Sequence, residues 1–275
     1  MKKRILIACD LEGVNNVVGE PYLGLVKECE QWKIAKHQAA LEINAAAEAF
    51  FDLGAEGVDL WDNHGGGGNI DAADLDPRVR ILACDPHKSR MYFAGEYDCV
   101  CYIGYHAMEG TLGGVLAHTM NSKTNQYYKL NGSYIGEVDM DAYIAASYGV
   151  PSCLFVGGDN ACAQASRAIP GIVTVVTKHE ISRNEAVFRD NEELFADIKA
   201  KASEAFQINM PTYPLTYPAV MEKSFKRVED AAKYLEKLRA CGIDADYLSD
   251  EILGKDAHTV QSTVYRIEDF IRCIY

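Results

Sequence analysis

The stretch Arg4–Asp10 (RILIACD) decides the fold class, because it is a short apolar run that ends abruptly in a carboxylate. A run of this length predicts a strand buried on both faces, as in the parallel sheets of α/β proteins. Lys3 and Arg4 give it a basic flank, but the apolar segment is too short for a signal peptide. We therefore expect it to be the first strand of a parallel sheet.

Similar apolar runs recur along the chain and alternate with longer amphipathic stretches. Strands are expected at Gly57–Trp61, Val79–Ala83, Cys99–Gly104, Ser152–Val156 and Gly171–Lys178. Helices are expected at Val26–Leu53, at Gly136–Tyr148, after Asp159 and from Asp190 to about Phe206. Capping-box patterns at Ser182–Glu185 and Asp190–Glu193 indicate helix starts. The alternation predicts an α/β fold: a doubly wound, mostly parallel sheet with helices on both faces.

The composition changes at residues 209–218, where three prolines fall within eight residues. Proline interrupts both helix and sheet, so this segment predicts a linker. Beyond it, the pattern predicts a small α+β lobe built from a strand, a helix, a strand and a short helix. We expect residues 1–208 to form an α/β catalytic domain that binds metal, and residues 209–275 to serve packing or oligomerisation. A separate hairpin is expected at Asn125–Ile135, with Asn131-Gly132 as a type I′ turn.

Composition and charge exclude several classes of protein. The 275 residues are 48% hydrophobic and 24% charged, which is ordinary for a globular protein. A net charge of −13 and a pI near 5.0 argue against nucleic acid and anionic membranes as partners. The apolar runs are all shorter than the roughly 20 residues of a membrane span. Nine cysteines without a CxxC pair indicate reduced thiols in a cytoplasmic protein.

Ionisable side chains gather where predicted strands end. Asp10 and Glu12 follow the first strand, His64 follows the second, and His106 follows the run Cys99–Gly104. The carboxyl ends of parallel strands lie on one edge of a sheet, so these side chains should converge there. Imidazoles and carboxylates together suit zinc, with manganese or iron as alternatives, and paired metals recur in hydrolases.

Other motifs are weaker on local evidence. His118 lies in the run LAHTM, and Glu137 opens a helix, where a glutamate commonly just complements the helix dipole. The glycines Gly65–Gly68 lack the spacing of a phosphate-binding loop and open no helix, so we expect a flexible loop beside a site. The chain contains neither a Walker A motif nor the GxSxG elbow of a serine hydrolase.

Taken in order, the motifs resemble those of the zinc-dependent D-aminopeptidase family encoded in dipeptide-transport operons. The motifs that carry the resemblance are Asp10-Leu11-Glu12-Gly13, Asp62-Asn63-His64, Gly104-Tyr105-His106-Ala107, His118-Thr119-Met120 and Gly136-Glu137 followed by Asp141-Ala142-Tyr143. Ile181-Ser182-Arg183 and the proline-rich segment 214–218 also fit. The order of the motifs and the chain length match the family from end to end.

The resemblance implies a site with two Zn²⁺ ions per chain. Asp10 would bridge the ions, Glu12 would bind one, and His64, His106 and Glu137 would complete the other. His118 would be the catalytic side chain, as nucleophile or general base, in the hydrolysis of N-terminal D-amino acids from short peptides. The resemblance also implies a ring-shaped homo-oligomer, with a decamer as one candidate size.

Two other functions stay open at this stage. Cys9, the segment Val14–Gly19 and the glycines Gly65–Gly68 depart from the family pattern in loops that should line the pocket. These changes do not alter the expectation of metal binding, but they leave the choice of substrate open, including the preference for D over L residues. One alternative is a related metal-dependent amidohydrolase that cleaves another amide. The other is a non-catalytic ligand-binding protein of the same fold, against which the presence of His118 argues.

Overall fold

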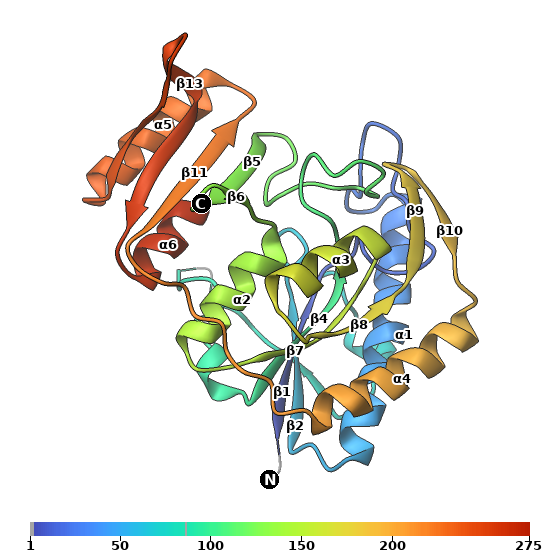
Figure 1. The fold of residues 1–275 in the computed structure, drawn as a ribbon. Helices are drawn as coiled ribbons and strands as arrows, with labels where there is room; N and C mark the ends of the chain where they lie inside the picture. Colours follow the sequence, from blue (N-terminus) through green and yellow to red (C-terminus); the bar gives the residue numbers. More distant parts are fainter. Residues whose placement is uncertain (1–2, 86) are drawn as a thin grey trace.

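A six-stranded parallel sheet forms the centre of the molecule. The computed structural model describes residues 3–85 and 87–275 (Figure 1). The strands lie in the spatial order β3 (Val79–Ile81), β2 (Gly57–Asp62), β1 (Arg4–Cys9), β4 (Cys99–Tyr105), β7 (Ser152–Gly157) and β8 (Val173–Val176). Every neighbouring pair is parallel. The strand order reverses direction between β1 and β4, which makes their carboxyl ends the topological switch point of the sheet.

Helices cover both faces of this sheet, as the sequence predicts (Figure 1). The helices α1 (Glu30–Asp52) and α4 (Asn191–Gln207) pack against each other on one face. The helices α2 (Glu137–Ser147) and α3 (Asp159–Ala168) lie on the other. Short 3-10 turns occur at Ala72–Asp74 and Ala94–Glu96. The predicted doubly wound α/β fold is confirmed.

A second, antiparallel sheet combines segments that are far apart in the sequence. Its strands lie in the order β12 (Asp244–Asp250), β13 (Gly254–Val264), β11 (Ala219–Phe225), β5 (Asn125–Leu130) and β6 (Ser133–Tyr134). The helices α5 (Val228–Ala240) and α6 (Ile267–Ile274) pack on this sheet. Asn131 and Gly132 both have positive φ, 49° and 81°, as a type I′ turn requires. Because the β5–β6 hairpin joins β11, this sheet takes strands from both sides of residue 209, and the boundary there stays a prediction.

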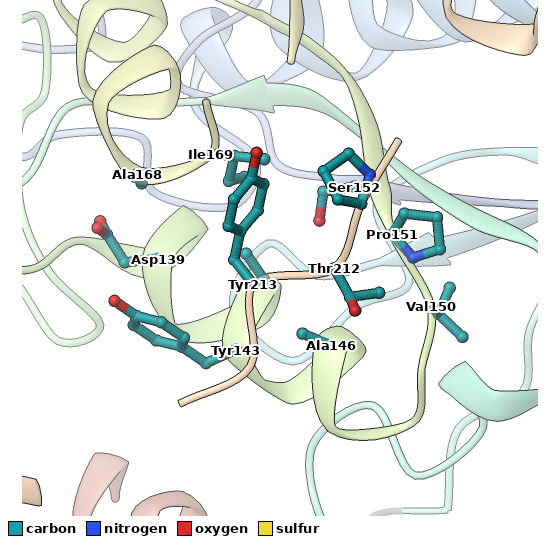
Figure 2. Close-up of a pocket in the computed structure, with 12 residues that line it drawn as sticks. Asp139, Tyr143, Ala146, Val150, Pro151, Ser152, Ala168, Ile169, Thr212 and Tyr213 are labelled. Carbon is teal, nitrogen blue, oxygen red and sulfur yellow. The ribbon is translucent and has the colours of Figure 1, made fainter. Parts of the chain in front are cut away.

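The proline-rich segment runs in extended form alongside α2 and the end of α3. The hydroxyl of Tyr213 donates a hydrogen bond to the carbonyl oxygen of Pro170 at 2.9 Å. Figure 2 shows Tyr213 and Thr212 beside Tyr143 of α2 and Ile169 after α3, around a cavity of about 10 Å³. Such a volume holds about one water molecule and excludes a substrate. This contact therefore fastens the linker to the parallel-sheet layer.

Three local predictions differ from the structure. Ser182–Glu185 starts no helix but turns between β9 (Lys178–Ser182) and β10 (Glu185–Phe188), which pair as a hairpin. The residues after Ser182 lack apolar side chains at helical spacing. The capping pattern is therefore not followed by a sequence that forms a helix. The helix α1 starts at Glu30 and not at Val26, with the Sγ of Cys29 accepting a hydrogen bond from the backbone N–H of Trp32. Strand β12 is polar and exposed along much of its length, and the apolar pattern therefore missed it.

Glu42 on α1 is a buried acid whose ionisation should set the pH dependence of stability. Burial raises the pKa of Glu42 from 4.5 to about 7, and its Oε2 is buried without a hydrogen-bond partner. A raised folded-state pKa contributes stability below pH 4.5, and this contribution is lost as the pH rises through 7. We expect Glu42→Gln to increase the free energy of unfolding by roughly 3 kcal/mol at pH 8 and to change it little at pH 4.5. Urea unfolding at both pH values measures the difference.

The control for this prediction is Glu48→Gln on the same helix. Glu48 is exposed and pairs with Lys199 at 2.6 Å, so its replacement should have a small effect at either pH. Equal stability of the Glu42→Gln variant and the wild type at pH 8 would show that Glu42 stays charged without penalty in the folded protein.

Candidate metal centre

The six side chains that the sequence singled out all come together at the carboxyl edge of the parallel sheet. Asp10 and Glu12 follow β1, His64 follows β2, and His106 follows β4 directly. Glu137 is the first residue of α2, whose N-terminus points at the same edge, and His118 lies in the loop between β4 and β5. The site thus sits at the switch point between β1 and β4.

One half of the site joins Asp10, Glu12 and His64. The Nδ1 atom of His64 lies 3.0 Å from Oδ1 of Asp10 and 3.1 Å from Oε2 of Glu12. Both carboxylates are buried, with exposed fractions of 4% and 5%. The resemblance had grouped His64 with His106 and Glu137, whereas the structure places it against Glu12.

The other half joins Asp10, His106 and Glu137. The Nε2 atom of His106 lies 3.6 Å from Oδ2 of Asp10 and 3.4 Å from Oε1 of Glu137. Asp10 therefore faces both halves, one oxygen toward each. On its other side the His106 ring is held by its Nδ1, which donates to the carbonyl oxygen of Ala107 at 2.9 Å. That bond leaves Nε2 free to act as an electron-pair donor.

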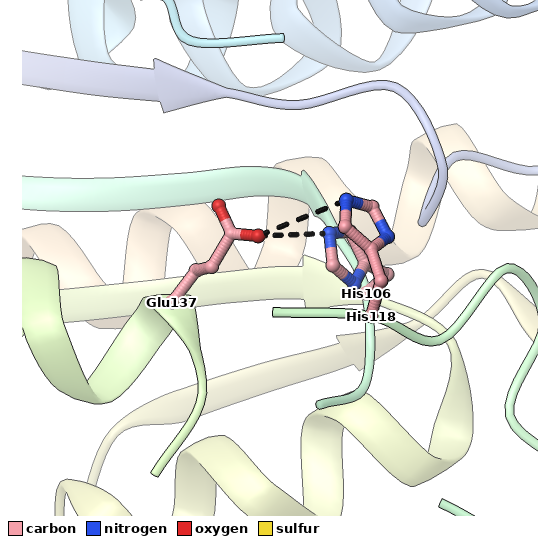
Figure 3. A group of neighbouring side chains, drawn as sticks. All are labelled: His106, His118 and Glu137. Carbon is pink, nitrogen blue, oxygen red and sulfur yellow. Dashed lines mark ion pairs between the residues drawn. The ribbon is translucent and has the colours of Figure 1, made fainter. Parts of the chain in front are cut away.

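His118 stands beside this second half. Figure 3 shows its ring stacked on that of His106, with centroids 3.9 Å apart, and both rings facing Glu137. The Nδ1 of His118 donates to the carbonyl oxygen of Leu116 at 2.9 Å, and its Nε2 lies 3.9 Å from Oε1 of Glu137. Hydrogen bonding at Nδ1 fixes the tautomer, so Nε2 of the neutral ring is an acceptor that faces the pocket.

Two glycines allow the strand ends to come this close. A Cβ on Gly104, which has φ +77°, would lie 2.1 Å from the carbonyl oxygen of Asp10. A Cβ on Gly13 would lie 1.9 Å from the carbonyl oxygen of Tyr105. The backbone N–H of Gly13 instead donates to the carbonyl oxygen of Gly104 at 2.7 Å. The contact carries the loop of Glu12 directly over the end of β4, and only glycine fits at either position.

Lys178 is a site residue that the sequence analysis did not identify. Its side chain is fully buried, and its Nζ donates to the carbonyl oxygens of Glu12, Val14 and Val17 at 2.6, 2.9 and 2.6 Å. Three carbonyls bound by one ammonium fix the loop that carries Glu12. Burial lowers the pKa of Lys178 to about 8. The signal in the sequence was a lysine at the end of an apolar strand, on the edge where the other polar groups lie.

The carboxylates and imidazoles strongly perturb one another. Burial raises the pKa of Asp10. The charge of Glu12 raises it further, because two neighbouring carboxylates repel each other. Burial opposes ionisation of Glu137 too, but the close approach and charge of His106 outweigh it and lower the pKa of Glu137 to about 2. Despite burial, the carboxylates raise the pKa of His106 to about 10. Burial and the neighbouring His106 lower the pKa of His118.

This donor set fits divalent metal ions. The Nε2 of His106 is buried and has no hydrogen-bond partner, although two carboxylate oxygens face it. A tetrahedral Zn²⁺ with bonds of about 2.1 Å separates its ligand atoms by about 3.4 Å, close to the 3.4 and 3.6 Å found here. Ligand atoms of Asp10, Glu12 and His106 lie within 4.8 Å of one another, as do those of His106, His118 and Glu137. A bound cation would take the place of a proton on His64 and His106, because only a neutral imidazole nitrogen binds a metal.

A pocket of about 390 Å³ opens onto these side chains. Asp10, Glu12, His64, His118 and Glu137 line its floor. Its walls come from the loop around Leu25, from the glycine loop after His64, and from the basic side chains Arg90, Lys123 and Arg183. Of these three, only Arg183 belongs to a motif quoted from the sequence. The pocket has the size expected for a small-molecule site.

Comparison with known proteins assigns the family. The model of the peptidase family M55, described as D-aminopeptidase, matches residues 3–242. The chain belongs to this D-aminopeptidase family. A curated D-aminopeptidase from Bacillus subtilis (strain 168) is 24% identical over 217 residues, or 78% of each chain. The resemblance found in the motifs is thereby confirmed.

The family fold is also seen in a solved structure. The Zn-dependent D-aminopeptidase DppA from Bacillus subtilis, described as a self-compartmentalizing protease, superposes with a TM-score of 0.84. The match covers 98% of this chain and 95% of that chain at 20% sequence identity. Within residues 3–85 and 87–275 of the present protein, no helix is both long and apolar enough to cross a membrane.

Proposed function

We propose that the chain is a metal-dependent hydrolase that releases N-terminal D-amino acids from short peptides. The observation that carries the proposal is the convergence of Asp10, Glu12, His64, His106 and Glu137 on one buried edge, within a chain of the D-aminopeptidase family. The relative DppA is Zn-dependent, and the donor atoms here suit that ion.

Each ligand residue has a defined place in this proposal. Asp10 would bridge two ions, Glu12 and His64 would complete one set of ligands, and His106 and Glu137 the other. When bound, the two ions lower the pKa of a water toward about 7 and polarise the carbonyl of the scissile bond. Hydrogen bonds from the backbone N–H of Leu11 to Asp10 and of Met120 to Glu137, both at 2.8 Å, orient these carboxylates.

His118 would handle the proton. His118 lines the pocket, and its Nε2 is available as an acceptor because the Leu116 carbonyl holds the proton on Nδ1. In this role it takes a proton from the attacking group and passes it to the amine that leaves when the C–N bond breaks. The acidic field of the whole chain, with a net charge of −13, favours a substrate that carries a protonated α-amino group.

The test of this function is release of alanine from D-Ala-D-Ala and from L-Ala-L-Ala, with and without a chelator. We expect chelator-sensitive release from the D substrate. Release from the L substrate alone would leave the metal mechanism in place and reassign the stereochemistry. Absence of release from both, with zinc bound, would contradict the peptidase function and favour another amide or a binding role.

The proposal extends to assembly, domain roles and location. We propose that the chain forms a ring-shaped oligomer like its self-compartmentalizing relative, and that residues 209–275 contribute to the subunit contacts. Exposed apolar side chains at the tips of two loops, Leu23 and Ile252, favour such contacts. Light scattering separates a ring from a monomer of 30.4 kDa.

A cytoplasmic location is part of the proposal, supported by nine free thiols.

A further inference from the structure

A second cavity adjoins the metal centre and is not used by the chemistry described so far. It measures about 500 Å³ and lies between the antiparallel sheet, α5 and the end of α6. Gly65, Met120 and Tyr275 line both this cavity and the pocket over the metal centre. The two cavities therefore adjoin each other, and they meet at these three residues.

The second cavity is lined by three lysines. Lys223 on β11 is buried, with an exposed fraction of 4%, and its Nζ donates to the carbonyl oxygen of Ile274 at 2.9 Å. Lys233 and Lys237 lie four residues apart on α5, which places them on one face of the helix. In the described chain, no carboxylate lies within 4.0 Å of any of the three amines, although Asp230 also lines the cavity.

The amine of Lys223 has aromatic neighbours in place of a counterion. Its Nζ lies 5.0, 5.1 and 4.5 Å from the ring centroids of Tyr128, Phe225 and Tyr234. Cation–π contact offsets part of the cost of burying an ammonium, but a buried cation is normally paired with an anion. Burial and the nearby Lys237 accordingly lower the pKa of Lys223 to about 7. An anionic ligand in the cavity would pair with the buried ammonium of Lys223 and would raise its pKa again.

We propose that this cavity is a subsite of the active site that binds the C-terminal carboxylate of the peptide substrate, through Lys223, Lys233 and Lys237. The inference rests on the proposed peptidase function and deepens it, because it assigns a preference for free peptides of defined length. The N-terminal residue lies at the metal centre, and the rest of the peptide extends past Met120. Each added residue lengthens an extended peptide by at most about 3.3–3.6 Å, so one length should fit best.

The experiment compares kcat/KM for alanine peptides of two to five residues that carry D-alanine at the N-terminus. Each length is assayed with a free and with an amidated C-terminus. At the best length we expect the free acid to be preferred at least about tenfold, the range of a charge-assisted hydrogen bond. Lys223→Met and the double variant Lys233→Met, Lys237→Met should each lower this acid-to-amide ratio toward one.

The ratio separates recognition from stability, since a variant that merely loosens the fold lowers both rates alike. Lys233 and Lys237 are exposed, so their variant tests the inference even if Lys223→Met does not fold. Lys129→Met is the matched control: Lys129 sits on β5 next to Tyr128, pairs with Glu222 at 4.0 Å and should keep the wild-type ratio.

The outcomes are distinct. Hydrolysis with a ratio near one at every length would overturn the subsite and leave the peptidase function standing. Retention of the wild-type ratio in the double variant and in Lys223→Met would also overturn it. Hydrolysis of no peptide would remove the proposed function, and the subsite with it.

Discussion

Replacing Asp10 with alanine is expected to abolish both zinc binding and peptide hydrolysis. Asp10 is the one carboxylate that faces both halves of the centre, with Oδ1 3.0 Å from His64 and Oδ2 3.6 Å from His106. Its loss removes a ligand and a negative charge from each half at once. Metal analysis after dialysis should show less than one ion per chain, and release of alanine should fall by at least about 10³-fold, given the share of catalysis that a metal supplies.

The control for Asp10→Ala is Asp159→Ala. Asp159 follows β7 at the same edge of the sheet, but its carboxylate binds the backbone N–H groups of Asn160 and Glu180 and does not touch the centre. This variant should keep its metal and its activity. Unchanged metal content and activity in Asp10→Ala would contradict the assigned centre. The circular dichroism spectrum of Asp10→Ala shows whether any loss comes from unfolding instead.

Replacing His118 with alanine is expected to separate catalysis from metal binding. The Nε2 of His118 reaches no closer than 3.9 Å to Glu137, and the five proposed ligands remain when its ring is removed. If His118 moves the proton, kcat should fall by about 10²–10⁴-fold, the usual contribution of general acid–base catalysis. The number of bound ions should be unchanged. Initial rates and metal analysis on the same preparation measure the two effects together.

The geometry makes the His118→Ala experiment informative whichever result is obtained. His118 also belongs to a group with His106 and Glu137 whose donor atoms lie within 4.8 Å of one another. A variant that loses activity and one ion together would identify His118 as a ligand. A variant with full activity would remove it from the mechanism. His37→Ala is the control, because His37 is exposed on α1, away from the pocket.

Much of the fold was predictable from short-range patterns. An apolar run of five to seven residues between polar ends predicts a buried strand, and β1, β2, β4 and β7 were found where those runs lie. The same patterns failed where structure depends on partners. Strand β12 is polar, and it is a strand only because β13 supplies its hydrogen bonds. The turn at Ser182–Glu185 carries a helix-start signal, yet pairing between β9 and β10 prevails.

The sequence by itself determined the class of this protein and the candidates for its site. Parallel strands bring their carboxyl ends to one edge, so Asp10, Glu12, His64 and His106 had to lie near one another whatever the loops did. Glu137 and His118 do not follow strands, and only the family resemblance placed them at the centre.

The tertiary structure alone decided how these groups are paired. It set His64 against Glu12, stacked His118 on His106 and put Lys178 under the loop of Glu12. It also formed the lysine-lined cavity, whose walls come from β5 and from β11, about ninety residues later. The physical reason is range: strand and helix signals act within a few residues, whereas these contacts depend on how distant segments close over the sheet edge.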